Sequence, residues 1–194
     1  MFSTSVSNLD LFRAWRDDED LDLAWLLDRL TRKVEETEQM RIGTALHKAL
    51  ETAPVGEFST LAANGYTFQF CGDVELCIPP HREVRISQQY GELEVRGRVD
   101  AISGLTVEDH KTTAQFDPDR FMGSYQWRMY LDMTNSHIFR WNVFVIRETD
   151  DPKIYSVVDF HRLEQRRYPA MHEDCLRLAH DFAAFAKENV EAFA

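Results

Sequence analysis

Asp100, Asp109 and Lys111 are the residues whose types and spacing point most clearly to chemistry. Two apolar-rich runs, Leu93–Ile102 and Leu105–Lys111, meet at a Ser-Gly pair, which predicts two strands joined by a tight hairpin turn. Side chains alternate along a strand, so Asp109 and Lys111 share one face, and the hairpin brings Asp100 close to Asp109. Two carboxylates beside an ammonium group can hold a divalent cation and stabilise negative charge on a phosphodiester. The alternative is a solvated hairpin face that carries an incidental ion pair.

Two further pairs of residues have the spacing of one helical turn. Gly43 and His47 form a Gly-x-x-x-His pair inside a helical pattern, and Gln126 and Tyr130 form a Gln-x-x-x-Tyr pair. This spacing places both members of a pair on the same helix face. A lone histidine on an apolar helix face is more often a core or helix-end residue, and the aromatic residues around Tyr130 could form a buried helix surface.

The order of these motifs along the chain carries a family resemblance. The order is His47, Asp100, Asp109-x-Lys111 and then Gln126-x-x-x-Tyr130. This pattern resembles the PD-(D/E)XK nuclease superfamily and, within it, the RecB-like exonuclease branch, which includes lambda exonuclease and the CRISPR-associated RecB-like exonucleases. The resemblance covers roughly residues 42–130 and implies an α/β fold, with a restriction-endonuclease-like core in which helices flank a mixed sheet. It also implies metal-dependent DNA hydrolysis, with exonuclease action favoured over internal cleavage.

The resemblance implies a role for each motif residue. The implied ligands of Mg²⁺ or Mn²⁺ are His47, Asp100, Asp109 and the main-chain carbonyl of His110. Lys111 would position the attacking water, with Asp100 and Asp109 completing the catalytic set. Gln126 and Tyr130 would hold the DNA strand, and Gly43 would permit the close approach of another element or of the DNA backbone.

Three neighbouring residues have weaker assignments. Glu83 lies one strand earlier and is a candidate for an extra acid near the metal, or equally a solvent-facing strand residue. Arg128 is a candidate phosphate contact, or part of a solvated face. Glu108 directly precedes Asp109, but strand alternation places it on the opposite face, so Asp109 is the predicted ligand.

The composition is that of a folded protein. With 194 residues, 44% apolar and 12% aromatic, the chain is expected to form a single nuclease-like domain over residues 1–194, with a helical N-terminal region at about 8–52. No apolar stretch is long enough to cross a bilayer and no secretion signal is recognisable, so no membrane contact is expected. Three scattered cysteines favour reduced thiols and cannot supply the four ligands of an iron–sulfur cluster. These features predict a cytoplasmic protein, and the resemblance implies a bacterial or phage-infected host cell.

The net charge of −11 opposes DNA binding. Much of the excess lies in two acidic runs, at 17–20 and 35–38, while the stretch 81–147 is roughly balanced. Weak long-range attraction predicts that a homo-oligomer or a DNA-delivering protein partner retains the substrate. A small chain of this kind suggests phage or mobile-element recombination or repair, by analogy alone. Two alternatives stay open: a non-catalytic nuclease-fold subunit that binds DNA ends or a partner, and an acidic protein that mimics DNA.

Hydrophobic periodicity predicts the secondary structure around the motifs. Helices are expected at 9–30, broken by the first acidic run, and at 37–52, 121–133 and 171–193. Strands are expected at 66–70, 74–78, 83–87, 138–146 and 154–160, besides the hairpin. The mildly basic stretch 162–167 is interpreted as a charged approach to the last helix, with a DNA-contacting edge as the alternative.

Overall fold

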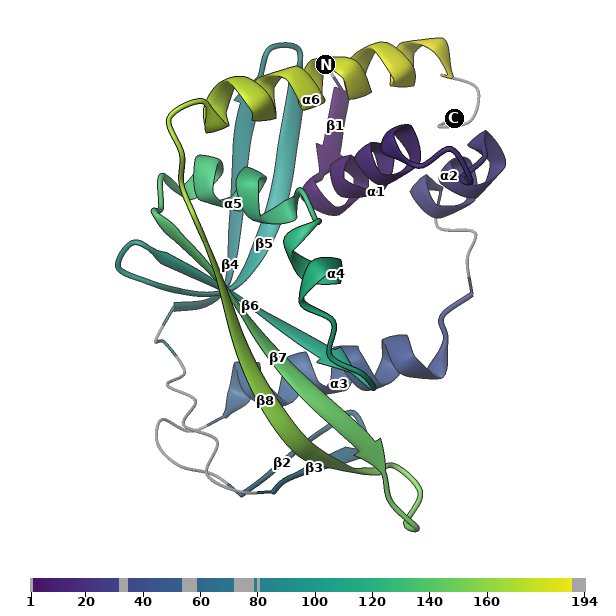
Figure 1. The fold of residues 1–194 in the computed structure, drawn as a ribbon, viewed down its shortest axis with the longest axis vertical. Coiled ribbons are helices and arrows are strands. Elements are labelled where there is room, and N and C mark those ends of the chain that lie inside the picture. Colours follow the sequence, from purple (N-terminus) through teal and green to yellow (C-terminus); the bar gives the residue numbers. More distant parts are fainter. Residues whose placement is uncertain (1, 32–34, 54–58, 72–78, 80, 190–194) are drawn as a thin grey trace.

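The computed structural model describes residues 2–31, 35–53, 59–71, 79 and 81–189 (Figure 1). The strands are β1 (Phe2–Ser5), β2 (Thr60–Ala63), β3 (Tyr66–Phe70), β4 (His81–Tyr90), β5 (Leu93–Ser103), β6 (Thr106–Thr113), β7 (Ile138–Glu148) and β8 (Ile154–Arg166). The helices are α1 (Val6–Asp17), α2 (Leu23–Leu30), α3 (Glu38–Thr52), α4 (Pro118–Met122), α5 (Gln126–Thr134) and α6 (Met171–Glu188). Within these ranges, no helix combines the length and the apolar character needed to cross a membrane.

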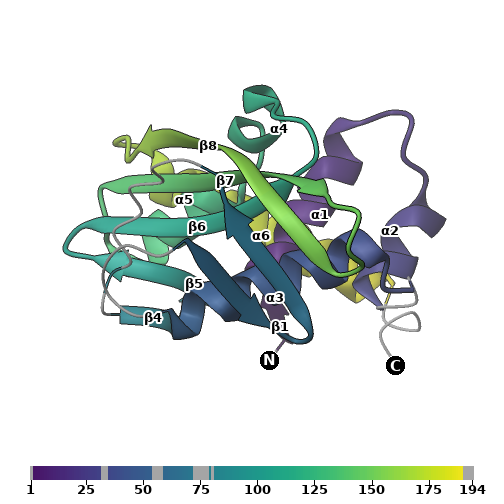
Figure 2. The same cartoon turned by 90° about the horizontal axis from the view of Figure 1, so that it is seen from below.

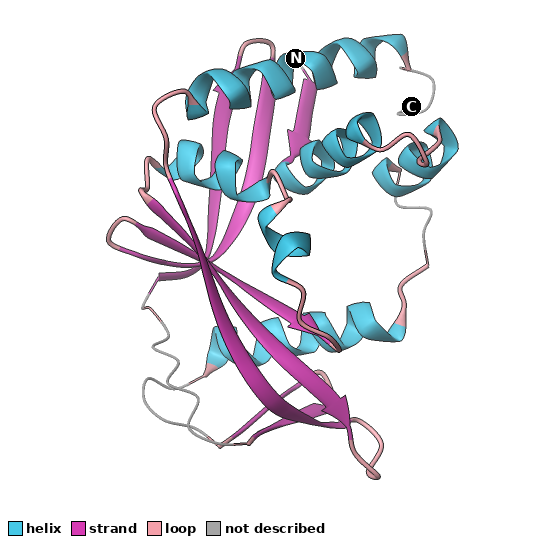
Figure 3. Cartoon of the chain, in the orientation of Figure 1, coloured by secondary structure: helices cyan, strands magenta, loops and turns pink. Residues whose placement is uncertain are grey.

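The eight strands form one mixed sheet in the order β1-β5-β6-β7-β8-β3-β2, with β4 paired to β5. The β6–β7 and β3–β8 pairs are parallel, whereas β7–β8 and β2–β3 are antiparallel. Helices lie along both faces of the sheet, as Figure 3 shows. This arrangement confirms the expected α/β class and is consistent with a restriction-endonuclease-like fold.

Two hydrophobic cores lie on the two faces of the sheet. Helices α1, α2, α5 and α6 pack on one face, over the half that contains β1, β4 and β5. Helix α3 packs on the other face, against β2, β3 and β6 (Figure 2). The neighbouring residues Val143 and Phe144 of β7 are both fully buried, one in each core. A strand covered on both faces explains the nearly continuous apolar run of β7.

The first three helices begin at side-chain caps. Ser5 accepts the N–H of Asn8 at α1, Asp22 accepts that of Trp25 at α2, and Thr37 accepts that of Met40 at α3. Such caps satisfy main-chain donors that the first turn of a helix leaves unpaired. The break between α1 and α2 falls at the acidic run, and α3 begins at Glu38, so these sequence predictions are confirmed.

Other boundaries differ from the sequence prediction. The helix expected at 121–133 is two helices, α4 and α5, separated at residues 123–125. The basic stretch 162–167 does not approach a helix, because β8 continues through it to Arg166 in register with β7. Strand β4 is longer than expected, while β1 and β2 carry too short an apolar pattern to be predicted. The strand expected at 74–78 and the end of the last helix after residue 189 lie outside the described residues.

Candidate active site

The predicted hairpin splits open at the candidate acids. β5 and β6 pair only from Ser103–Thr106 to Ala101–Glu108, one position before Asp100 would face Asp109. β4 occupies one edge of β5 along its length, so β1, which pairs with Leu93–Arg96, shares the other edge with β6. Residues 97–100 therefore lie in a gap between β1 and β6. Main-chain groups at such a gap need other partners.

Asp100 supplies one of these partners. Its Oδ2 accepts the main-chain N–H of His110 on β6, at 2.7 Å. The same oxygen lies 3.4 Å from Nδ1 of His47, which reaches the gap from α3. Burial alone would raise the pKa of Asp100, but the hydrogen bond and the charge of His47, with Lys111, lower it to about 2. Burial opposes protonation of His47, yet Asp100 outweighs it and raises the pKa of His47 above 6.5.

Asp109 and Lys111 form an ion pair beside this contact, in which the carboxylate is buried and the lysine side chain is 33% exposed. Asp109 is 4% exposed, and Nζ of Lys111 lies 2.9 Å from both of its carboxylate oxygens. Oδ1 accepts the hydrogen bond, whereas Oδ2 has no donor in hydrogen-bonding geometry within the described part of the chain. Burial raises the pKa of Asp109, although Lys111 opposes the shift. Burial would lower the pKa of Lys111, but Asp109 and Asp100 raise it, so the lysine is a cation at neutral pH.

Glu108 and His110 point away from Asp109 and Lys111, as strand alternation predicts. Glu108 accepts hydrogen bonds from Arg140 at 3.0 Å and from Asn142 at 2.8 Å, both on β7. The ring of His110 is buried, and burial lowers its pKa to about 4. Its imidazole is therefore neutral at neutral pH, and its main chain is the part that faces Asp100.

Helix α3 is held against the sheet at two points. A Cβ on Gly43 would lie 3.3 Å from Oγ1 of Thr112 on β6, so the glycine allows the close packing that the sequence suggested. At the other end, Nη1 of Arg82 on β4 donates to three main-chain carbonyls at the C-terminus of α3, those of Leu50, Glu51 and Ala53. A cation at this end satisfies unpaired carbonyls and complements the helix dipole. Together these contacts position His47.

Helix α5 carries Gln126 and Tyr130 on the opposite side of the gap. The hydroxyl of Tyr130 donates to the main-chain carbonyl of Arg98 at 3.0 Å, within the gap of β5. A Cβ on Gly97 would lie 2.5 Å from Cε1 of Tyr130, so only glycine permits this packing. Burial raises the pKa of Tyr130, and a hydrogen bond with the side chain of Gln126 opposes the shift. The two residues therefore meet, although Tyr130 is also a buried core residue at 5% exposure.

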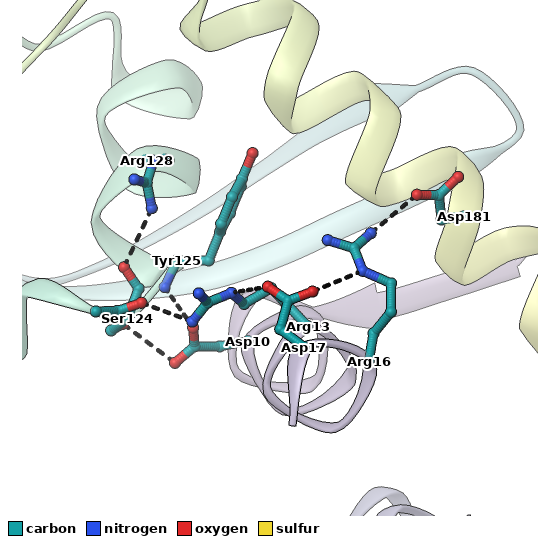
Figure 4. Close-up of polar contacts among 9 residues, drawn as sticks. Asp10, Arg13, Arg16, Asp17, Ser124, Tyr125, Arg128 and Asp181 are labelled. Carbon is teal, nitrogen blue, oxygen red and sulfur yellow. Dashed lines mark hydrogen bonds and ion pairs between the residues drawn. The ribbon is translucent and has the colours of Figure 1, made fainter. Parts of the chain in front are cut away.

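The start of α5 is held from α1 (Figure 4). The N-cap residue Tyr125 makes no side-chain cap of its own; the carboxylate of Asp10 accepts the N–H of Tyr125 and the hydroxyl of Ser124. The Ser124 hydroxyl oxygen in turn accepts the N–H of Gln126, at 3.1 Å. Arg13 donates to the carbonyl of Gly123 at 2.7 Å, so α1 fixes the whole turn between α4 and α5. This network sets the position of Gln126.

Glu83 lines the site, whereas Arg128 does not. Glu83 has a φ of +53°, and the pairs Arg82–Ala101 and Val84–Val99 place it opposite Asp100. A non-glycine residue in this left-handed region is uncommon. The Glu83 carboxylate pairs with Nε of Arg98 at 2.7 Å; burial raises its pKa and Arg98 opposes the shift. Arg128 instead lies over the rings of Tyr125 and Trp127, at 4.7 and 4.5 Å.

An open groove leads to the gap. It has a volume of about 430 Å³, and its lining includes Gly43, Thr44, His47, Lys48, Glu83 and Arg98. Two carboxylates, one imidazole and a main-chain carbonyl are donors that suit Mg²⁺ or Mn²⁺. Among the described residues, Oδ2 of Asp109 accepts no hydrogen bond, although Nζ of Lys111 lies 2.9 Å from it. Across the described ranges, however, no three His, Cys, Asp or Glu side chains are arranged to hold a metal ion. Ligation by the whole set would therefore require side-chain adjustment.

Three positioning residues escaped the sequence analysis. Asp10, Arg82 and Gly97 act over long sequence separations, on α5, α3 and Tyr130 respectively. In the sequence, Asp10 has no feature that distinguishes it from other helix residues, and Arg82 is one basic residue among many. The only available signal was the glycine inside the apolar β5 pattern, which suggests a close approach by another element.

Comparisons with known proteins concern the fold. No protein-family model matches the chain, and no curated protein matches it by sequence. The crystal structure of SSO0001 superposes with a TM-score of 0.54 at 17% identity, covering 95% of this chain and 77% of that one. An alkaline exonuclease (LHK-Exo) from Laribacter hongkongensis gives a TM-score of 0.48 at 15% identity, covering 98% and 91%. The LHK-Exo complex with dAMP gives a TM-score of 0.49 at 14% identity, covering 98% of this chain and 90% of that one. The similarity to SSO0001 shows a shared fold.

Proposed function

We propose that this chain is a Mg²⁺- or Mn²⁺-dependent deoxyribonuclease, with exonuclease action favoured over internal cleavage. The observation that carries the proposal is the ion pair between the buried Asp109 and the partly exposed Lys111, which lies beside Asp100 where the β5–β6 hairpin opens. Burying a carboxylate is costly even beside an ammonium group, so this pair is weak evidence for a purely stabilising role. The preference for DNA ends rests on the resemblance carried by the Gly43–His47 and Gln126–Tyr130 pairs.

The residues of the site divide the work by their chemistry. A bound cation, held by Asp100, Asp109, His47 and the carbonyl of His110, would supply Lewis acidity and a more acidic water. Lys111, kept protonated by Asp109, donates hydrogen bonds that orient water and offset negative charge developing on the phosphate. Tyr130 and Gln126 lie across the gap, where they would position the strand.

Retention of the substrate is part of the proposal. The chain has a net charge of −11, so long-range attraction to DNA is weak. We propose that self-association or a DNA-delivering protein supplies retention, and that a lone subunit cleaves distributively with strong sensitivity to salt. Light scattering combined with a processivity assay tests this step. A strict monomer that is highly processive at physiological salt without a partner would contradict it.

The test of the activity uses four substrates. Linear and closed circular DNA, each single- and double-stranded, are incubated with purified protein and Mg²⁺, Mn²⁺ or EDTA. An exonuclease degrades linear molecules in the presence of metal and spares circles, whereas an endonuclease also cuts circles. Metal-dependent cleavage of none of the four substrates would overturn the proposal. Binding of DNA ends without cleavage would favour the non-catalytic alternative.

A further inference from the structure

Alternate residues of β4 and β5 form a basic surface beside the groove. On β5, the side chains of Arg96 and Arg98 are 63% and 65% exposed. The register pairs Arg98 with the exposed Arg85 of β4, and Arg96 with the exposed Ser87. Val95 and Val99, which flank the two arginines on β5, are buried in the core with α1, α5 and α6, so the arginines lie on the opposite face. We call Arg85, Arg96 and Arg98 the arginine track.

The cross-strand pair of Arg85 and Arg98 is an unfavourable arrangement for an isolated sheet. Like charges directly opposite each other on antiparallel strands destabilise the pairing. Glu83 balances Arg98, and Glu94 balances Arg96 at 2.6 Å. No carboxylate in the described part of the chain forms an ion pair with Arg85. An anion bound across the two strands would relieve this repulsion.

The arginine track is continuous with the groove. Arg98 lines the groove together with His47 and Glu83, and it lies two residues from Asp100 on the same face of β5. Two residues of a strand span roughly 7 Å. The track therefore begins at the candidate active site and continues through Arg96 away from it. Guanidinium groups recognise phosphate in bidentate geometry, and the Ser87 hydroxyl adds a neutral donor.

We propose that the arginine track binds the sugar–phosphate backbone of the DNA strand that enters the active site. The inference rests on the proposed nuclease function and extends it by assigning the surface that holds the substrate. Contacts to phosphate carry no sequence information, so binding is independent of sequence. The track also places positive charge locally in a chain whose total charge is strongly negative.

Salt dependence of binding tests the arginine track. Affinity for a labelled single-stranded oligonucleotide is measured over a range of salt concentrations in the Asp109→Asn background, which keeps the substrate intact. Each lost phosphate contact reduces the slope of log Kobs against log salt by about 0.7 for single strands. Arg85→Ala and Arg98→Ala should each show this reduction with several-fold weaker binding, equally for different sequences. Arg98→Lys should keep the slope, because it keeps the charge.

Arg177→Ala is the matched control. Arg177 on α6 is 69% exposed and pairs with Asp174, as Arg96 pairs with Glu94, so its loss should leave the slope unchanged. Cleavage by the wild-type protein is measured in parallel. An unchanged slope in the Arg85→Ala/Arg98→Ala protein, or no measurable binding by the Asp109→Asn parent protein, rejects the track, whether or not the wild-type protein cleaves DNA. A reduced slope without wild-type cleavage supports the track and rejects the nuclease.

Discussion

Asp100 bonds to the main chain of His110 where their two strands have already separated, with 2.7 Å between Asp100 Oδ2 and His110 N. Asp100 is therefore both a candidate metal ligand and the partner of a main-chain donor that the split ladder leaves free. Asp100→Ala should lower the free energy of unfolding by about 1–3 kcal/mol, because the N–H of His110 loses its acceptor. Urea denaturation of the metal-free protein measures this cost.

Asp100→Asn separates the two roles. Its carbonyl oxygen can still accept the N–H of His110, so most of the stability should remain, whereas the lost charge should abolish metal-dependent cleavage. A cleavage assay alongside the denaturation curves measures both. Equal stability of the Ala variant and the wild-type protein would show that the His110 contact contributes nothing.

Gly97→Ala tests the packing of α5 on the gap. The added Cβ would lie 2.5 Å from Cε1 of Tyr130 and 3.1 Å from Cγ2 of Val6, so α5 must move or the ring must rotate. Overpacking of this kind costs about 1–3 kcal/mol of stability. Displacement of Tyr130 should also weaken DNA binding. Tyr130→Leu, which removes the clashing ring edge, should restore part of the stability lost in Gly97→Ala, and failure to do so would contradict this packing.

Asp10→Ala tests whether α1 positions Gln126. Loss of the cap should cost about 0.5–2 kcal/mol and weaken DNA binding, since the first turn of α5 frays. Asp22→Ala removes the same kind of cap from α2 and should cost similar stability without weakening DNA binding. Hydrogen exchange should show faster exchange of the amides of 125–128 only in Asp10→Ala. Equal exchange at these amides in both variants would remove Asp10 from this role.

The sequence could predict which candidate residues share a face because its motifs are local. Asp109 and Lys111 are two residues apart on one strand, and Gln126 and Tyr130 are one helical turn apart, so periodicity alone aligns each pair. The packing of helices on the sheet depends instead on distant contacts such as Asp10 with Tyr125 and Gly97 with Tyr130. No local pattern encodes such pairs.

The predicted ends of several helices and strands were wrong for a related reason. β8 carries charged residues up to Arg166 because its neighbour β7 supplies the pairing, and tertiary contacts override a sequence that looks like a loop. The turn that separates α4 from α5 is stabilised by Asp10 and Arg13 from α1, which the sequence around residues 123–125 does not reveal. Element types were therefore easier to predict than their ends.

The pH dependence of stability should report the His47–Asp100 contact. His47 has a pKa raised above 6.5, so its protonated form favours folding; this contribution is complete below the unfolded value and is lost as pH rises through the folded value. The pKa of Asp100 is lowered to about 2. Its contribution to stability is therefore present above the unfolded value of 3.8 and is lost as pH falls from there through the folded value of about 2.

Asp100→Asn should shift this behaviour in a defined direction. Without the carboxylate, burial lowers the pKa of His47 below its unfolded value, so the sign of the dependence reverses: the contribution of His47 to stability should rise, not fall, as pH increases toward that unfolded value. Urea denaturation of metal-free protein from about pH 5 to pH 8 measures this reversal, and NMR titration of the ring gives the pKa directly. An unchanged His47 pKa in Asp100→Asn would show that the two side chains do not interact in solution.

Cleavage by Asp109→Asn and Glu108→Gln tests the central claim most directly. The two acids are neighbours on β6, yet Asp109 faces Lys111 in the gap while Glu108 pairs with Arg140 and Asn142. Rates on a labelled linear DNA with Mn²⁺ are compared per folded molecule. Asp109→Asn should lose essentially all metal-dependent cleavage, and Glu108→Gln should keep it even where its melting temperature falls. Wild-type cleavage by Asp109→Asn, or loss of cleavage by Glu108→Gln alone, would contradict the assignment.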